Sequence, residues 1–124
     1  MSKSKSELSD LFDLTHQLVC IPSESFQEQE ISNFVASKLA EAPWLDISRI
    51  GDNIVAKTNN DQGMRVLLGG HTDTVPAQGN DQIRLAEDSI WGIGSADMKG
   101  GIAIMLSLAT NIPDAAVDMT YVFY

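Results

Sequence analysis

The stretch LLGGHTDTVP, residues 67–76, determines how the chain is expected to fold. Apolar and small residues lead into His71, a threonine separates His71 from Asp73, and a Val-Pro pair follows. In an extended strand the side chains of residues two apart point to the same face, so His71 and Asp73 are expected to share a face. The stretch therefore predicts a strand that ends in an imidazole and a carboxylate.

The apolar run that precedes His71 reaches back to residue 64, as MRVLLGGH. A nearly continuous apolar run of this length is typical of a strand buried on both faces in the middle of a sheet. We therefore expect residues 64–71 to form a central strand.

Helical and strand patterns alternate on both sides of this segment. Residues 6–23 and 25–43 have apolar residues at helical spacing, and Ser25 and Glu28 have the spacing of a capping box. The pattern of residues 45–59 predicts a β-hairpin around Gly51, and that of residues 83–94 predicts a second, shorter one. Residues 98–113 predict a helix and residues 117–124 a further buried strand. The expected class is α/β, with a mixed β-sheet flanked by helices.

Composition narrows the possible partners and compartments. The 124 residues correspond to one domain or part of one, with 8 basic against 17 acidic residues and a formal charge of −9. Such a surface repels phosphate backbones and anionic lipid, so we expect neither nucleic acid nor a membrane as partner. Cys20 is the single cysteine and is expected in the core. Without a signal-peptide pattern or a long apolar run, the expected location is the cytoplasm.

A second motif, WGIGSADMKGG at residues 91–101, carries a candidate metal ligand. Asp97 lies 26 residues after His71, just ahead of a predicted helix and among four glycines. An imidazole that binds a metal usually donates its other N–H to a carboxylate, a role open to Asp73. The glycines do not form a nucleotide-binding loop. Asp97 stands where the dinucleotide-binding fingerprint requires glycine, and Lys99 is not part of the Gly-Lys-Ser/Thr sequence that a P-loop requires. A helix N-cap role for Asp97 stays open and is compatible with metal binding.

Taken together, GGHTDTVP and WGIGSADMKGG resemble the two metal-site motifs of the M20 family of zinc-dependent amidohydrolases and exopeptidases. The opening LVCIPSES and the hairpin segment NIVAKTN are also similar to that family. The resemblance implies a zinc-exopeptidase-like catalytic domain, and it is strongest to the succinyl-diaminopimelate desuccinylases. It thus implies hydrolysis of N-succinyl-LL-2,6-diaminopimelate in lysine biosynthesis, with acetylornithine deacetylase or an M20 carboxypeptidase as the alternative. A metal-free binding module is the alternative outside enzymes.

The resemblance also implies roles for three residues. His71 matches the histidine that binds one zinc, and Asp73 matches the catalytic aspartate that orients it. Asp97 matches the carboxylate that bridges two zincs, in a family where the following peptide bond is often cis. The implied cofactor is Zn²⁺, two per complete site with Co²⁺ possible, and the implied substrate is a small N-acyl amino acid. Two such ions about 3.5–4 Å apart polarise an amide carbonyl.

The chain departs from the family pattern after Tyr124, its last residue. The family's glutamate base usually follows a strand like TYVFY, and a catalytic zinc normally has three protein ligands. Residues 1–124 are therefore expected to be the N-terminal part of a truncated catalytic domain, inactive alone, without the remaining ligands and the lid or dimerisation domain. A homodimer stays open for the full-length protein.

Overall fold

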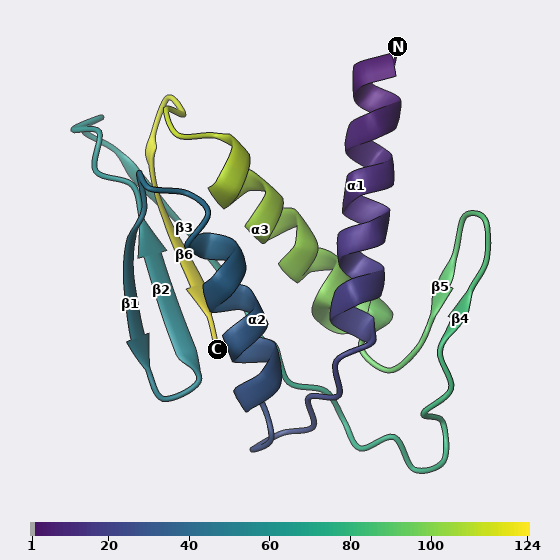
Figure 1. Ribbon diagram of the computed structural model, residues 1–124. Coiled ribbons are helices and arrows are strands. Elements are labelled where there is room, and N and C mark those ends of the chain that lie inside the picture. The colour runs from purple at the N-terminus through teal and green to yellow at the C-terminus, as the bar shows by residue number, and fades with distance from the viewer. Residues whose placement is uncertain (1) are drawn as a thin grey trace.

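The computed structural model describes residues 2–124, with side chains from residue 7 onward. The elements are α1 (Ser2–Val19), α2 (Gln29–Leu39), β1 (Asp46–Ile50), β2 (Asn53–Lys57), β3 (Arg65–Gly70), β4 (Arg84–Leu85), β5 (Ile90–Trp91), the single π-helical turn η1 (Ser95–Lys99), α3 (Gly100–Asn111) and β6 (Asp118–Phe123). Figure 1 shows the sheet on one side of the molecule, with α2 and α3 beside it and α1 beyond them. The predicted helices and both predicted hairpins are present.

The main sheet has four strands in the order β1-β2-β6-β3. β1 pairs antiparallel with β2, and β2 pairs antiparallel with β6. β3 runs parallel to β6, so the sheet is mixed as predicted. Tyr121 and Phe123 of β6 are almost fully buried, which agrees with the expected buried strand at residues 117–124.

Residues 64–71 were predicted as a central strand, but within residues 2–124 β3 lies at the edge of the sheet. Leu67 is 63% exposed, and Val66 is also exposed. A continuous apolar run shows that both faces of a strand are apolar, but not that both are covered. In the described part of the chain, β6 is the one strand that pairs with β3, and the helices pack on one face of the sheet.

The hydrophobic core lies between that face and the helices. Buried side chains from α1, α2, α3, β2 and β6 form it, among them Leu18, Val35, Ile54, Ile102 and Phe123. At the end of β3, a Cβ on Gly70 would lie 2.8–2.9 Å from side-chain atoms of α3 and the preceding turn. The glycine therefore allows α3 to lie close to the strand that leads into His71.

Two expectations about the segment after α1 were wrong. Cys20 is exposed, because it follows the last residue of α1 and the buried positions there are occupied by Leu18 and Val19. Ser25 caps no helix, since α2 begins at Gln29 and Glu28 is its N-cap residue without a side-chain cap. The Ser25 hydroxyl instead bonds a residue far along the chain, as described below.

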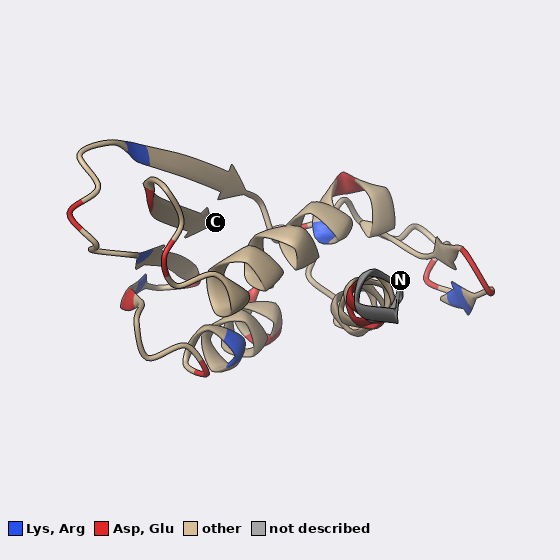
Figure 2. Cartoon of the chain, turned by 90° about the horizontal axis from the view of Figure 1, so that it is seen from above, with Lys and Arg blue, Asp and Glu red and all other residues tan. Residues whose placement is uncertain are grey.

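Acidic residues are distributed along the chain, from the sheet to the β4–β5 hairpin, rather than gathered on one element (Figure 2). Among residues 2–124, none of the helices combines the length and apolar character needed to cross a membrane.

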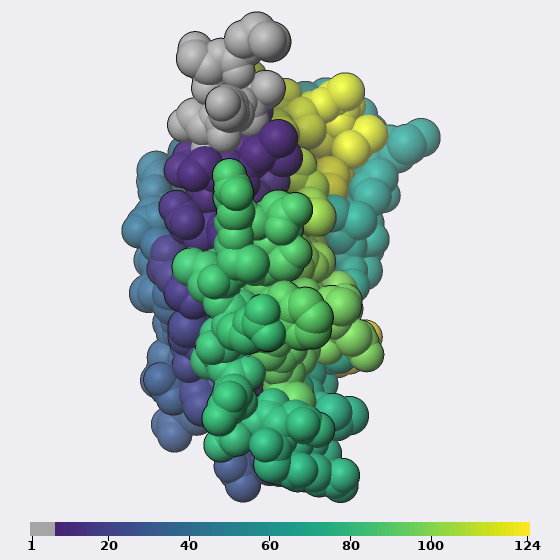
Figure 3. Space-filling model, turned by 90° about the vertical axis from the view of Figure 1, so that its right-hand side faces the viewer, coloured from purple at the N-terminus to yellow at the C-terminus, as the bar shows by residue number. Residues whose placement is uncertain are grey.

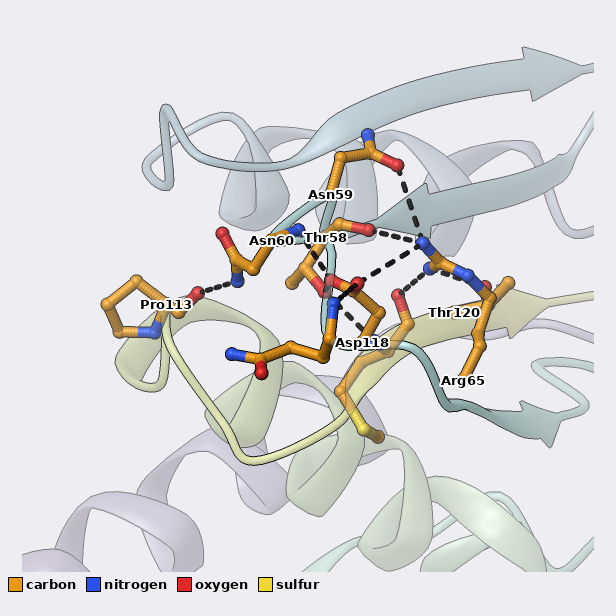
Figure 4. Close-up of polar contacts among 9 residues, drawn as sticks. Thr58, Asn59, Asn60, Arg65, Pro113, Asp118 and Thr120 are labelled. Carbon is orange, nitrogen blue, oxygen red and sulfur yellow. Dashed lines mark hydrogen bonds and ion pairs between the residues drawn. The ribbon is translucent and has the colours of Figure 1, made fainter.

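Asp118, the first residue of β6, organises the loop between β2 and β3 (Figure 4). Its Oδ1 accepts hydrogen bonds from the Thr58 hydroxyl at 2.8 Å and the Asn60 backbone N–H at 2.7 Å. Its Oδ2 accepts one from the Gln62 backbone N–H at 3.0 Å and lies 3.9 Å from the Arg65 guanidinium. The N–H donors of Gln62 and Asn60 hold the pKa of this carboxyl below its usual value.

Candidate metal-binding site

His71 directly follows β3, at the end where the parallel strands β3 and β6 both finish. The pairing continues past the strands: the Tyr124 N–H donates to the Gly70 carbonyl at 3.0 Å, and the Thr72 N–H donates to the Tyr124 carbonyl at 2.7 Å. The carboxyl end of a sheet is where open α/β folds place their ligands. The backbone on both sides of His71 is therefore held by β6.

Both ring nitrogens of His71 face oxygen atoms. Nδ1 lies 3.0 Å from the backbone carbonyl oxygen of Asp73 and 3.2 Å from its Oδ1. Nε2 lies 2.8 Å from Oδ1 of Asp97. The structure thus brings together the three residues singled out from the sequence, although β3 ends at Gly70 and strand alternation does not cause the Asp73 contact.

The surroundings of His71 favour a positive charge on or beside its ring. Partial burial lowers the pKa of His71. The hydrogen bonds to the Asp97 carboxylate and the Asp73 backbone, together with the negative charges of both side chains, raise it by more, so the pKa lies above the usual 6.5. A neutral imidazole carries one N–H and can donate to only one of these partners. When Nδ1 donates to Asp73, the lone pair of Nε2 faces a carboxylate, so a cation between Nε2 and Asp97 would be stabilised.

Asp97 lies in η1, outside the helix proper. Its backbone angles are non-helical (φ −135°, ψ 90°), and its peptide bond to Met98 is cis, as the family resemblance implied. The N-cap residue of α3 is Lys99, so Asp97 does not cap that helix. The turn begins at Gly94, which has φ +81° and would place a Cβ only 2.6 Å from the Thr74 side chain. Glycine is required there because other residues rarely adopt that φ and lack the space.

Lys99 has a role that the sequence analysis did not assign. Its side chain is 2% exposed, and its ammonium donates to the Ile21 carbonyl at 2.6 Å. Burial lowers the pKa of Lys99 to about 8. The contact ties η1 to the segment that follows α1, and no spacing in the sequence indicated this long-range pair.

A cavity of about 360 Å³ lies beside these groups. His71, Asp73 and Asp97 line one part of it, and Ser25 and Ser95 also face it. The β4–β5 hairpin connects the two halves of the site along the chain and projects from the surface beside α1 (Figure 3). The candidate ligands are therefore accessible to a small molecule.

The donor atoms suit a zinc ion but do not complete its ligand set. Two ligand atoms about 2.1 Å from one tetrahedral zinc lie roughly 3.4 Å apart, so His71 Nε2 and Asp97 Oδ1, at 2.8 Å, need to separate by about half an ångström. Within the described residues, no group of three or more His, Cys, Asp or Glu side chains is placed to hold a metal ion. The site has two candidate ligands.

Comparison with known proteins decides the family. Residues 67–124 match the peptidase family M20/M25/M40. Over 116 residues, which make up 93% of this chain and 33% of the relative, the sequence is 43% identical to a putative succinyl-diaminopimelate desuccinylase of Mycobacterium tuberculosis.

The chain belongs to the M20 peptidase family.

A second curated relative and a solved structure are also similar to the chain. The chain is 37% identical over 123 residues to the succinyl-diaminopimelate desuccinylase of Corynebacterium glutamicum, covering 94% of this chain and 33% of the relative. A crystal structure from Bacillus subtilis, described as a dinuclear metal-binding peptidase of the M20 family, covers 96% of this chain and 35% of its own length, with a TM-score of 0.67 and 19% identity. The M20 catalytic fold expected from the motifs is confirmed. This M20 chain spans about a third of the length of the curated relatives it matches.

Proposed function

We propose that residues 1–124 form part of the catalytic domain of a metal-dependent amide hydrolase. The observation that carries the proposal is the His71 ring, whose Nε2 faces the Asp97 carboxylate at 2.8 Å while Nδ1 faces Asp73. Histidine and carboxylate groups are the ligands that hydrolytic zinc sites use. The description of the B. subtilis M20 structure as dinuclear metal-binding supports a site for two metal ions.

In this proposal the three residues have separate tasks. His71 binds one metal ion through Nε2, and Asp73 orients the ring by accepting a hydrogen bond from Nδ1–H. Asp97, whose carboxylate is exposed, would hold the two ions together. The metal supplies Lewis-acid polarisation of the amide carbonyl. The general base and the further ligands come from the part of the domain outside residues 1–124.

We propose N-succinyl-LL-2,6-diaminopimelate as substrate, in the diaminopimelate and lysine pathway of the cytoplasm. The names of the M. tuberculosis and C. glutamicum relatives support this choice. A cavity with two serines beside the candidate ligands can admit a polar small molecule.

A chimaera tests the function. Residues 1–124 would replace the matching third of the C. glutamicum relative, and hydrolysis would be measured with zinc present. We expect N-succinyl-LL-2,6-diaminopimelate to be hydrolysed much faster than N-acetylornithine, and residues 1–124 alone to hydrolyse neither. A folded, zinc-loaded chimaera that hydrolyses neither amide would overturn the proposal.

The change Asp73→Asn is expected to lower kcat of the chimaera about 10- to 100-fold while most of the zinc stays bound. The amide removes the negative charge beside His71 Nδ1 but no metal ligand, and the backbone carbonyl of residue 73 can still accept from Nδ1–H. Steady-state kinetics and metal analysis provide the two readouts, with the exposed Asp61→Asn as charge-matched control. An unchanged kcat would remove the orienting role of Asp73.

The change Asp97→Ala is expected to reduce the metal content of the chimaera from two zinc ions to one or none. Without the carboxylate, His71 Nε2 loses its partner at 2.8 Å and the two ions lose their bridge. Metal analysis after gel filtration measures the stoichiometry. Two ions retained per chain would show that Asp97 does not bridge them.

A further inference from the structure

We propose that Ser25 is a positioning residue of the metal site. Its hydroxyl fixes the Asp73 carboxylate and, through it, the orientation of the His71 ring. The inference rests on the proposed function for the identity of the ion, but the contacts that carry it belong to the chain itself.

The two carboxylate oxygens of Asp73 are engaged by different partners. Ser25 Oγ donates a hydrogen bond to Oδ2 at 2.5 Å, and Oδ1 lies 3.2 Å from His71 Nδ1. A carboxylate with no fixed oxygen can rotate about its Cβ–Cγ bond. The hydrogen bond of Nδ1 itself goes to the Asp73 backbone carbonyl at 3.0 Å, and Oδ1 adds an ion-pair contact. The hydrogen bond from Ser25 to Oδ2 holds the plane of the carboxylate, so its charge stays directed at the ring, and hydrogen bonds to an ionised group are stronger than neutral ones. Ser25, Asp73 and His71 therefore form a chain that leads to the metal-facing Nε2.

The backbone explains why Ser25 reaches Asp73, 48 residues away. The Thr74 N–H donates to the Ser23 carbonyl at 2.8 Å, and the Ser25 N–H donates to the Thr74 carbonyl at 3.2 Å. Glu24 and Thr74 form an isolated parallel bridge. These bonds place the segment after α1 alongside the segment after β3, so Ser25 stands beside Asp73 whatever its side chain does.

A purely structural role for the Ser25 hydroxyl is disfavoured by its surroundings. Ser25 is exposed, faces the cavity and caps no helix. Its neighbour Ser23 has the opposite properties: it is 1% exposed, and its hydroxyl donates to the Thr72 carbonyl at 2.8 Å. Both serines connect the same two segments, but only the Ser25 hydroxyl contacts Asp73 among the described residues. Ser23 is therefore a matched control for loss of a serine hydroxyl in this loop.

The experiment uses the 124-residue chain in a His16→Gln background, which leaves His71 as the one histidine. Zinc is titrated into this parent and into Ser25→Ala, Ser25→Thr and Ser23→Ala while the His71 ring signals are followed by NMR. We expect Ser25→Ala to weaken zinc binding about three- to tenfold, and Ser25→Thr to stay within about twofold of the parent, since threonine keeps the hydroxyl. Ser23→Ala should lower the melting temperature but keep the parent affinity.

The metal-free spectra provide a second readout. Ring ¹⁵N shifts report which nitrogen of neutral His71 carries the proton. We expect Ser25→Ala to reduce the fraction protonated on Nδ1, and Ser25→Thr and Ser23→Ala to leave it unchanged.

The outcomes separate this inference from the proposed function. Parent-like affinity and tautomer in Ser25→Ala would overturn the positioning role. An equal loss in Ser23→Ala would also overturn it, because the loop as a whole would then be responsible. If the parent binds no zinc at His71, two ligands are too few to hold the ion in this chain, and the tautomer comparison alone decides the role of Ser25; the metal proposal is then tested by the chimaera.

Discussion

Replacing His71 with alanine is expected to abolish zinc binding at its ring and to lower amide hydrolysis by the chimaera at least about 10³-fold. A metal ion contributes several kcal/mol of transition-state stabilisation, and each 1.36 kcal/mol corresponds to a factor of ten in rate. The loss should be large because His71 supplies one of only two candidate ligands in the described residues. Alanine leaves no group that can replace Nε2.

His16 provides the control for the His71 experiment. It lies on α1 with Nε2 3.5 Å from Cys20 Sγ, and it does not line the cavity beside His71. His16→Ala removes an imidazole from the same chain and should leave zinc content and hydrolysis unchanged. Retained zinc and retained activity in His71→Ala would refute the ligand assignment.

The second large effect is expected from Asp118→Asn, which should lower the melting temperature by roughly 5–10 °C at neutral pH. The change keeps the shape of the side chain but puts an NH₂ group where an acceptor stood. Donors from Thr58, Asn60 and Gln62 converge on the carboxylate, so at least one of them would lose its partner (Figure 4). Thermal unfolding followed by circular dichroism measures the change.

The lowered pKa of Asp118 predicts how the stability difference between wild type and Asp118→Asn depends on pH. The pKa of Asp118 is lowered in the folded chain, so above the ordinary value of 3.8 its charge stabilises the fold. That stabilisation is lost as the pH falls through the folded pKa, because the carboxyl is then protonated in both states. The difference in stability between wild type and Asp118→Asn should therefore shrink below about pH 4.

The control for Asp118 is Asp114→Asn, which makes the same charge change at an exposed position between α3 and β6. Its melting temperature should stay within about 1 °C of wild type. If both variants lose the same stability, the effect is one of net charge and the hydrogen bonds of Asp118 contribute nothing specific.

Local patterns in the sequence predicted the elements and the three main site residues. Alternating residues around Gly51 predicted the β1–β2 hairpin, and helical spacing predicted α1, α2 and α3. His71 and Asp97 were found from two short motifs 26 residues apart. These features are readable because side-chain direction repeats every two residues in a strand and every 3.6 in a helix.

The tertiary structure decided the strand order and the long-range contacts, which local sequence patterns do not contain. The sequence predicted β3 as a central strand, but strand order depends on which strand pairs with each edge, and within residues 2–124 β3 lies at the edge. The sequence pattern predicted that Ser25 and Glu28 form a helix capping box. The Ser25 hydroxyl instead donates a hydrogen bond to Asp73, because the backbone of residues 23–25 runs beside residues 72–74. The sequence pattern assigned no role to Lys99, whose partner Ile21 is 78 residues away. Sequence periodicity therefore predicted the elements, and the two motifs predicted the candidate ligands. Long-range pairing determined which groups surround His71, because those contacts form only when distant segments pack together.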